Sequence, residues 1–331
     1  MIKVFLFPFL FVILGCMPSG SPPNKSVVSN SNKKYKVGVI PKSTSHAYWK
    51  NVHAGVSKAA LELGVEIEWK GSKGESNAEA QIRILKEMGE NPSIDAILIA
   101  PSDYKALAAP IETIQKKGKP VIIIDSGVET DYVAYIASDN YHGGTHCAKY
   151  IAELLGKEQS TVLVLRHLPY SASTLERERG FLDAIKKFKN IKVILSEDFV
   201  GDDYDFSRKY VEKMIEKYPH IKGIFAPAEP LTVGAFRALE RKNLNKKIKL
   251  VGYDASTALI SAIHEGKIDG IMLQSPYDMG YEALTVAYAY LHNIPFSKIN
   301  YTDQALLTPY NYKERPLREF LTPEVNHWDI Q

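Results

Sequence analysis

The sequence predicts an α/β fold built from two doubly wound parallel sheets. Short runs rich in Val and Ile alternate along the chain with stretches whose apolar residues recur at helical spacing. Runs that are apolar throughout are typical of strands buried on both faces, as in a parallel sheet. There are ten short Val- and Ile-rich runs, and a chain of 331 residues is long enough for two domains. Strand–helix alternation repeated this often therefore indicates two sheets, each covered by helices.

The expected strands fall into two consecutive sets of five. They are residues 36–40, 65–69, 96–100, 121–125 and 133–137, followed by residues 161–165, 192–195, 223–226, 250–253 and 270–273. Helical stripes lie between them. Val52, Val56 and Leu63, for example, share one face of a helix that follows the first strand.

The composition is that of an ordinary globular protein. Hydrophobic residues make up 45% of the chain and charged residues 24%, with 41 Lys and Arg against 38 Asp and Glu. A formal net charge of +3 with no long basic block is too small for a protein that neutralises nucleic-acid phosphates. Two cysteines cannot build a disulfide framework or a cysteine-based zinc site. We therefore expect no nucleic-acid partner and no cofactor.

The start of the chain differs from the rest and predicts a signal peptide at residues 1–15. The apolar stretch at residues 4–14 is about half of the roughly 20 residues that span a bilayer. Residues 13–16 (Ile-Leu-Gly-Cys) resemble the cleavage box of bacterial lipoproteins, so cleavage would leave Cys16 as the lipidated first residue. The alternative is an ordinary secretory signal with an incidental cysteine.

Residues 16–34 are expected to form a flexible tether, because they are rich in Ser, Pro and Asn and carry no apolar periodicity. A tether of this kind would hold a globular part away from a membrane surface. The sequence thus predicts a protein of the bacterial cell envelope that is lipid-anchored and faces the periplasm or the exterior.

Polar and aromatic side chains gather where the expected strands end. Ligands of open parallel sheets bind at the C-terminal ends of the strands. The side chains found there include Tyr48, Trp49, Asp125, Arg177, Tyr204 and Asp254. Carboxylates accept hydrogen bonds from two hydroxyls, a guanidinium donates through a planar fork, and aromatic rings cover a C–H face. This combination fits a sugar.

Each of these residues also has a plainer interpretation. Asp125 or Asp254 alone could be a helix N-cap. Trp49 could be core packing on an amphipathic helix, and Arg177 could be a solvated helix charge. Their shared position at strand ends is what favours a binding site.

Sequence motifs of catalysis are missing. The chain has no Gly-x-Ser-x-Gly elbow, no Gly-x-x-x-x-Gly-Lys-Ser/Thr phosphate loop and no His-Glu-x-x-His. His142 and His146, four residues apart, could be a metal pair, but no further ligand completes a set, so a surface or hinge-proximal role is expected. Asp125 and Asp254 could be imagined as a glycosidase acid pair, but both are placed to bind. We expect a binding protein rather than an enzyme, and no metal site.

Five motifs carry a resemblance to a known family. They are residues 136–140 (Ile-Ala-Ser-Asp-Asn) followed by Gly143 and Gly144, 177–181 (Arg-Glu-Arg-Gly-Phe), 233–239 (Val-Gly-Ala-Phe-Arg-Ala-Leu), 251–254 (Val-Gly-Tyr-Asp) and 266–268 (Gly-Lys-Ile). Over residues 35–299 the chain resembles the periplasmic sugar-binding proteins of the ribose- and galactose-binding type, which share their fold with lactose-repressor-like regulators. The resemblance implies the type I periplasmic binding protein fold, with two similar lobes joined by three crossings near Asp139, Ser275 and Asp303.

The resemblance also implies roles for individual residues. Tyr48 and Trp49 look like the aromatic pair that stacks on the sugar. The other ligand-facing positions are His46, Asp125, Ser126, Ser173, Arg177, Tyr204, Glu229, Asp254 and Gln274.

Two departures from the family's pattern bear on the ligand. Ala228 and Glu229 stand where relatives commonly carry Asn-Asp, and Ser126 stands where the ribose binders have arginine. Because unmatched buried polar groups are costly, these departures predict a ligand other than ribose.

The implied organisation is a first lobe of residues 35–138 and 275–302 and a second lobe, with tail, of residues 139–274 and 303–331. The lobes would close around a monosaccharide or similar polyol, and the closed form would deliver it to the permease of an ABC transporter. The alternative is a sensor lipoprotein that presents a sugar or an autoinducer to a chemoreceptor or a histidine kinase. In either case we expect a monomer held to the membrane by its lipid.

Overall fold

Two six-stranded sheets, each in its own lobe, organise the chain. The computed structural model describes residues 34–313. The predicted signal peptide, the lipidation site at Cys16, nearly all of the tether and the tail beyond residue 313 lie outside the described residues.

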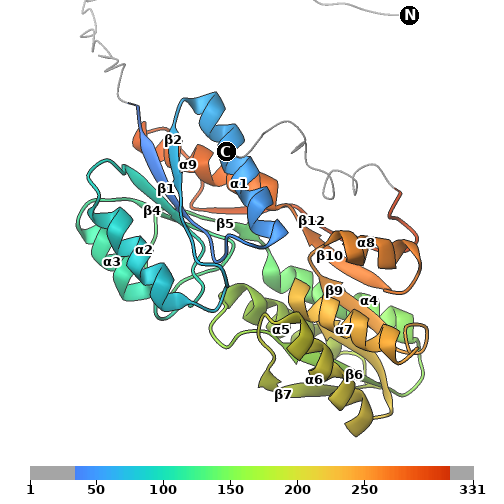
Figure 1. The fold of residues 1–331 in the computed structure, drawn as a ribbon. Helices are drawn as coiled ribbons and strands as arrows, with labels where there is room; N and C mark the ends of the chain where they lie inside the picture. The colour runs from blue at the N-terminus through green and yellow to red at the C-terminus, as the bar shows by residue number, and fades with distance from the viewer. Residues whose placement is uncertain (1–33, 314–331) are drawn as a thin grey trace, which may run out of the picture. The chain divides into compact units, whose positions relative to one another are not determined.

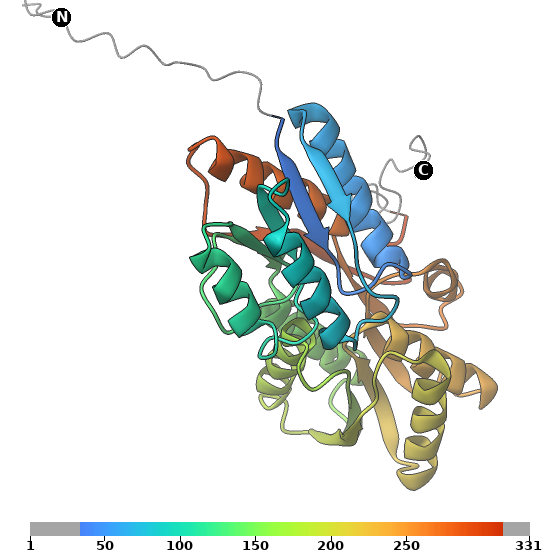
Figure 2. The same ribbon diagram turned by 60° about the vertical axis from the view of Figure 1, so that its left-hand side comes forward.

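The first sheet is entirely parallel, with the strand order β11-β5-β4-β3-β1-β2 (Figure 1). Its strands are β1 (Lys36–Ile40), β2 (Glu66–Trp69), β3 (Ala96–Ile99), β4 (Val121–Ile124), β5 (Tyr135–Ser138) and β11 (Ile299–Thr302). Its helices are α1 (Ala47–Leu63), α2 (Ala78–Glu90), α3 (Ala108–Lys116) and α9 (Pro276–Leu291). Helices α1 and α9 pack on one face and α2 and α3 on the other (Figure 2). The central strands β3 and β4 are buried at every position, which explains their uniformly apolar sequences.

The second sheet has the order β12-β10-β9-β8-β6-β7, and β12 runs antiparallel to β10. Its strands are β6 (Ser160–Arg166), β7 (Ile191–Phe199), β8 (Ile221–Ala226), β9 (Lys249–Tyr253), β10 (Gly270–Gln274) and β12 (Gln304–Leu307). Its helices are α4 (Asn140–Leu155), α5 (Ala172–Ile185), α6 (Tyr204–Lys217), α7 (Glu229–Arg241) and α8 (Thr257–His264). Helices α4 and α5 cover one face, and α6, α7 and α8 cover the other. Each lobe is therefore a three-layer unit.

The chain passes between the two sheets at three places. Asp139 lies between β5 and α4, Ser275 between β10 and α9, and Asp303 between β11 and β12. These are the positions at which the crossings were expected. Each sheet is thus completed by a strand from the C-terminal part of the chain.

The two strands that the sequence did not predict are β11 and β12. Both are edge strands of four residues. In β11, Ile299 and Tyr301 are 52% and 57% exposed, so the strand lacks the continuous apolar run that marks the buried strands. The expected run at 192–195 also proves to be part of the longer edge strand β7.

Helices α4 and α5 approach each other closely because glycines face backbone at their crossing. A Cβ on Gly144 would collide with the carbonyl oxygen of Arg177, and one on Gly180 with that of Tyr141. Neither collision could be relieved by turning a side chain, because the obstacle is main chain in both cases. The close approach sets the position of Arg177 on α5.

We expect Gly144→Ala to lower the free energy of unfolding by about 1–3 kcal/mol, because the added methyl must push α5 away from α4. Urea unfolding followed by circular dichroism measures this. Gly74→Ala is the control, since a Cβ there would meet nothing closer than the Asp202 carboxylate at 3.7 Å. Equal stability of the two variants would contradict the packing described.

Candidate ligand-binding site

A cavity between the lobes lies at the carboxyl ends of strands from both sheets; we call it the ligand cavity. Of the residues expected to contact ligand, those that line it are Tyr48, Trp49, Asp125, Ser173, Arg177, Glu229, Asp254 and Gln274. The sequence did not single out five other polar or cyclic side chains on its wall: Lys42, Glu75, His167, Thr174 and Pro230.

Two aspartates occupy matching places in the two lobes. Asp125 directly follows β4 and Asp254 directly follows β9, and both have a backbone φ of 61°. The N–H of Asp125 donates to Ile136 O at 2.9 Å, and that of Asp254 to Met272 O at 2.9 Å. A neighbouring strand thus holds each residue in the left-handed region, which non-glycine residues rarely occupy. Neither aspartate caps a helix, so the N-cap interpretation is wrong for both.

Arg177 is fixed by three groups of the second lobe. It is 3% exposed; its Nε donates to Asn140 Oδ1 at 2.8 Å, and its Nη1 donates to Pro227 O at 3.0 Å. The same Nη1 lies 3.5 Å from Asp254 Oδ2. Burial raises the pKa of Asp254, and the Arg177 charge opposes that rise. Arg177 is therefore not a solvated helix charge.

A lysine supplies the cation of the first lobe. Lys42 Nζ lies 2.7 Å from Asp125 Oδ2, and both side chains are almost fully buried. Tyr48 donates its hydroxyl to the other carboxylate oxygen, Oδ1, at 2.9 Å. Lys42 thus supplies a positive charge beside Asp125, although the next residue, Ser126, is uncharged. Ser126 itself does not line the ligand cavity; its Oγ accepts a hydrogen bond from Ser173 N at 3.1 Å.

Trp49 is both core and cavity wall. It is 1% exposed and packs in the first lobe's core, while its Nε1 donates to Glu75 Oε1 at 2.7 Å. Its ring meets that of Tyr48 edge-on, with centroids 5.0 Å apart. Core packing of Trp49 is therefore confirmed, and its contact with a sugar stays a prediction.

His46 and Tyr204 stand behind the cavity wall rather than on it. The Tyr204 hydroxyl donates to Glu229 Oε2 at 2.7 Å and so holds that carboxylate. His46 Nδ1 lies 3.6 Å from Glu75 Oε1, and this contact raises the pKa of His46. Burial alone would raise the pKa of Glu75, but His46 and the Lys42 charge outweigh it and lower that pKa to about 2. Glu75 is therefore an acceptor throughout the physiological range.

Two buried polar groups on the wall have atoms without partners. Neither ring nitrogen of His167 has a hydrogen-bond partner among the described residues, and neither does Gln274 Oε1. The amide nitrogen of Gln274 is used, because it donates to Asp254 Oδ1 at 2.5 Å. The hydroxyl groups of a sugar bound in the cavity are suitable partners for such atoms.

The lobes touch each other directly across the ligand cavity. Lys42 Nζ donates to Ser173 Oγ at 3.1 Å, and Glu75 N donates to Asp202 Oδ2 at 3.3 Å. The cavity volume is about 40 Å³, whereas an apolar ring such as benzene occupies a cavity of roughly 150 Å³. A sugar ring therefore requires the lobes to separate before it enters.

The part of the chain that the structure describes offers little for metal chemistry or for crossing a membrane. No group of three or more His, Cys, Asp or Glu side chains between residues 34 and 313 could hold a metal ion. His142 and His146 have ring centroids 4.5 Å apart and are exposed on α4, while Cys147 is buried. Within the same residues, no helix is long and apolar enough to span a bilayer.

A model of the family described as "periplasmic binding protein domain" matches residues 37–294. The chain belongs to this family. It is a family of binding proteins rather than enzymes, as expected.

Known proteins are similar over most of this periplasmic binding protein. The ribose import binding protein of Bacillus subtilis is 27% identical over 295 residues, which cover 88% of this chain and 93% of the relative. The crystal structure of the periplasmic component of an ABC-type sugar transport system from Hahella chejuensis is 30% identical, with a TM-score of 0.79, covering 82% of this chain and 99% of that one. A carbohydrate transporter solute-binding protein from Agrobacterium radiobacter, solved with D-arabinose, is 27% identical, with a TM-score of 0.81 and coverage of 87% and 98%. These matches confirm the type I fold with two parallel-sheet lobes.

The unpartnered His167 gives this periplasmic binding protein a specific acid sensitivity. Burial lowers the pKa of His167 from 6.5 to about 4. Between these two pH values the unfolded chain binds a proton that the folded chain does not, so stability falls as the pH falls. We expect a loss of about 3 kcal/mol across this window, which His167→Asn removes.

Urea unfolding at a series of pH values measures the effect, with His220→Asn at an exposed histidine as the control. The comparison is made above pH 4.5, the usual pKa of a glutamate, because Glu75 adds its own loss below it. Parallel pH profiles for wild type and His167→Asn would contradict the burial of a neutral imidazole.

Proposed function

We propose that this periplasmic binding protein captures a monosaccharide between its two lobes and delivers it to the permease of an ABC transporter. One observation carries the proposal. Each lobe presents an aspartate at the end of a strand, paired with a buried cation, and both pairs face one cavity: Asp125 with Lys42, and Asp254 with Arg177. The relatives, which include a ribose import binding protein and a protein solved with D-arabinose, support the same function.

The paired charges suit vicinal hydroxyls. A hydroxyl can donate to a carboxylate while its oxygen accepts from the adjacent ammonium or guanidinium, and such charge-assisted hydrogen bonds are the strong ones. Tyr48 and Trp49 add ring surface for a C–H face. Because both cations are already paired with carboxylates, a neutral ligand fits better than a sugar acid.

Capture proceeds by a change in lobe separation. Contacts such as Lys42 with Ser173 hold the lobes together, and a sugar that enters must replace them with its own hydroxyls. The closed form gains stability only from contacts that both lobes make at once, so closure is a population shift driven by the sugar. The permease then binds the closed form.

The ligand is a neutral monosaccharide or similar polyol, and ribose itself is disfavoured. Lys42 restores a positive charge beside Asp125, but its single ammonium lacks the planar fork of the arginine that ribose binders carry next to their acid. Ala228 and Glu229 further change the pattern of donors. A thermal-shift screen against pentoses, hexoses and their alcohols tests this.

We expect one or a few sugars of that screen to raise the melting temperature by mass action, at concentrations above their dissociation constants. Isothermal titration then gives the affinity. A flat response to every sugar would contradict monosaccharide capture and direct the screen to nucleosides and autoinducers.

The lipid anchor belongs to the same proposal. A lipid on Cys16 would keep the binding protein at the membrane that holds the permease. The Ser-, Pro- and Asn-rich segment after it would let the two lobes reach the permease. Expression in a bacterial host with an alkyne-labelled fatty acid should label the wild type and leave Cys16→Ser unlabelled. Equal labelling of both would contradict the site.

A further inference from the structure

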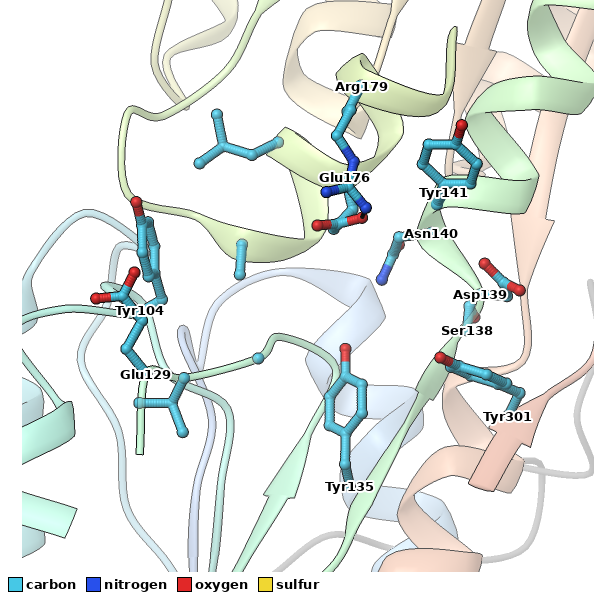
Figure 3. A pocket seen from close by; sticks show the side chains of 14 residues that line it. Tyr104, Glu129, Tyr135, Ser138, Asp139, Asn140, Tyr141, Glu176, Arg179 and Tyr301 are labelled. Atoms are coloured by element: carbon cyan, nitrogen blue, oxygen red, sulfur yellow. Dashed lines mark hydrogen bonds and ion pairs between the residues drawn. The ribbon is translucent and has the colours of Figure 1, made fainter. Parts of the chain in front are cut away.

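A second cavity lies on the other side of helix α5 from the ligand cavity, and we call it the flanking cavity (Figure 3). Its volume is about 580 Å³, against about 40 Å³ for the ligand cavity. Helix α5 serves both: Ser173, Thr174 and Arg177 line the ligand cavity, while Glu176 and Arg179 line the flanking cavity. The proposed function leaves this larger cavity unused.

The wall of the flanking cavity combines aromatic rings with acceptors and donors. Four tyrosines line it, Tyr104, Tyr135, Tyr141 and Tyr301. Figure 3 shows the Tyr135 hydroxyl pointing into the middle of the cavity, with Tyr104 on one side and Tyr301 on the other. These rings come from both lobes and from the crossing strand β11.

The polar groups keep unused hydrogen-bonding capacity. Asp139 Oδ1 accepts from His142 N at 2.9 Å, and Arg179 Nη2 lies 2.6 Å from Glu176 Oε2. A carboxylate has about four lone-pair sites, so Asp139 and Glu176 can each accept further hydrogen bonds. Asn140 is 5% exposed; its Oδ1 accepts from Arg177, and its amide nitrogen points toward the flanking cavity (Figure 3). The wall thus offers both acceptors and donors beside its aromatic rings.

We propose that the flanking cavity is a second carbohydrate site, which takes a neutral sugar or polyol. Carboxylates accept hydrogen bonds from hydroxyl groups, a guanidinium donates to them, and tyrosine rings cover C–H faces. Glu129, Asp139 and Glu176 face a single cation, Arg179, on this wall, so an acidic sugar is disfavoured. The volume is more than ten times that of the ligand cavity, so the flanking cavity can admit a ring without separation of the lobes.

Two hydrogen bonds connect the flanking cavity to the ligand cavity. Asn140 holds Arg177 on one side and faces the flanking cavity on the other. Tyr135 donates its hydroxyl to the backbone oxygen of Asp125 at 3.4 Å. A molecule that contacts Asn140 and Tyr135 therefore touches the supports of both anchoring aspartate–cation pairs, and any effect on affinity must be reciprocal between the two sites.

The test uses the full chain and isothermal titration with D-ribose, D-allose and D-arabinose as probes. The background is Asp254→Ala, whose ligand cavity has lost its anchor. We expect this protein to bind at least one probe with an affinity in the millimolar range, and Tyr301→Ala in the same background to weaken that binding about 3- to 10-fold. Tyr290→Ala is the matched control, because Tyr290 is a partly exposed tyrosine (42%, against 57% for Tyr301) that does not line the flanking cavity.

The outcomes of these titrations decide whether the flanking cavity binds a sugar. Residual binding that Tyr301→Ala weakens and Tyr290→Ala does not supports the second site. No residual binding of any probe, or residual binding that both variants leave unchanged, overturns it. The proposed function is judged separately by the tight binding of the wild type, so either can fail while the other stands.

Discussion

Asp254→Ala is expected to weaken sugar binding by at least about 100-fold while the chain still folds. The carboxylate accepts from Gln274 and pairs with Arg177, and in the closed form it also accepts from sugar hydroxyls. Hydrogen bonds to a charged group contribute about 1.5–3 kcal/mol each, so the loss of two hydrogen bonds from sugar hydroxyls accounts for the expected change in affinity. Isothermal titration with the sugar found by the thermal-shift screen measures it.

Two further variants make the result interpretable. Asp254→Asn keeps a residue that tolerates the positive φ of 61° and removes only the charge. Asp183→Ala, in an exposed ion pair with Lys186 on α5, should bind as wild type does. Undiminished affinity in both Asp254 variants would refute the site assignment.

Arg177→Ala is a poorer test than the sequence suggests. From the sequence alone, its loss is expected to remove binding and leave the fold intact. Arg177 is buried, however, and donates to Asn140 and to Pro227 O, so its removal also leaves those acceptors and Asp254 unmatched. We expect that variant to lose stability as well as affinity.

Lys42→Met is expected to lower the free energy of unfolding by about 3–5 kcal/mol, the usual cost of leaving one partner of a buried ion pair alone. Lys42 and Asp125 are each 4% exposed, and Nζ lies 2.7 Å from Oδ2. Lys42→Met combined with Asp125→Asn should recover much of the loss, because no uncompensated charge then remains. Urea unfolding of the two single variants and the double variant measures the coupling.

The control for this cycle is an exposed pair. Lys70 lies 2.6 Å from Glu87, with side chains 43% and 60% exposed, and we expect Lys70→Met to cost less than about 1 kcal/mol. If Lys42→Met were no more damaging than Lys70→Met, the Lys42–Asp125 pair would not be buried in the folded protein.

The buried strands and the strand-end residues could be predicted because both leave a local signal. A strand covered by helices on two faces is apolar at every position, as β3 and β4 are, whereas the expected edge strands β2 and β7 carried a weaker apolar pattern. The edge strands β11 and β12 lack this signal, since only one residue of each is buried. The same rule of strand ends led to Asp125, Asp254 and Gln274.

The missed site residues depend on contacts that no local pattern encodes. Glu75 lies in the loop after β2, and only Trp49 and His46, more than twenty residues earlier, reveal its role. Lys42 and His167 do follow strands β1 and β6, so strand ends could have indicated them. The sequence also does not specify the direction of a side chain. For this reason Ser126, His46 and Tyr204 were expected on the cavity wall.

Gln274 Oε1 and the two ring nitrogens of His167 are buried and have no hydrogen-bond partner within residues 34–313. A ligand that offers these groups no hydrogen-bond partner leaves them unsatisfied, which lowers its affinity. They therefore discriminate against sugars that lack a particular hydroxyl. A deoxy analogue that omits the matching hydroxyl would fit the space and still be refused. The ligand cavity would thereby sort fully hydroxylated sugars from their deoxygenated counterparts, a distinction that shape alone could not make.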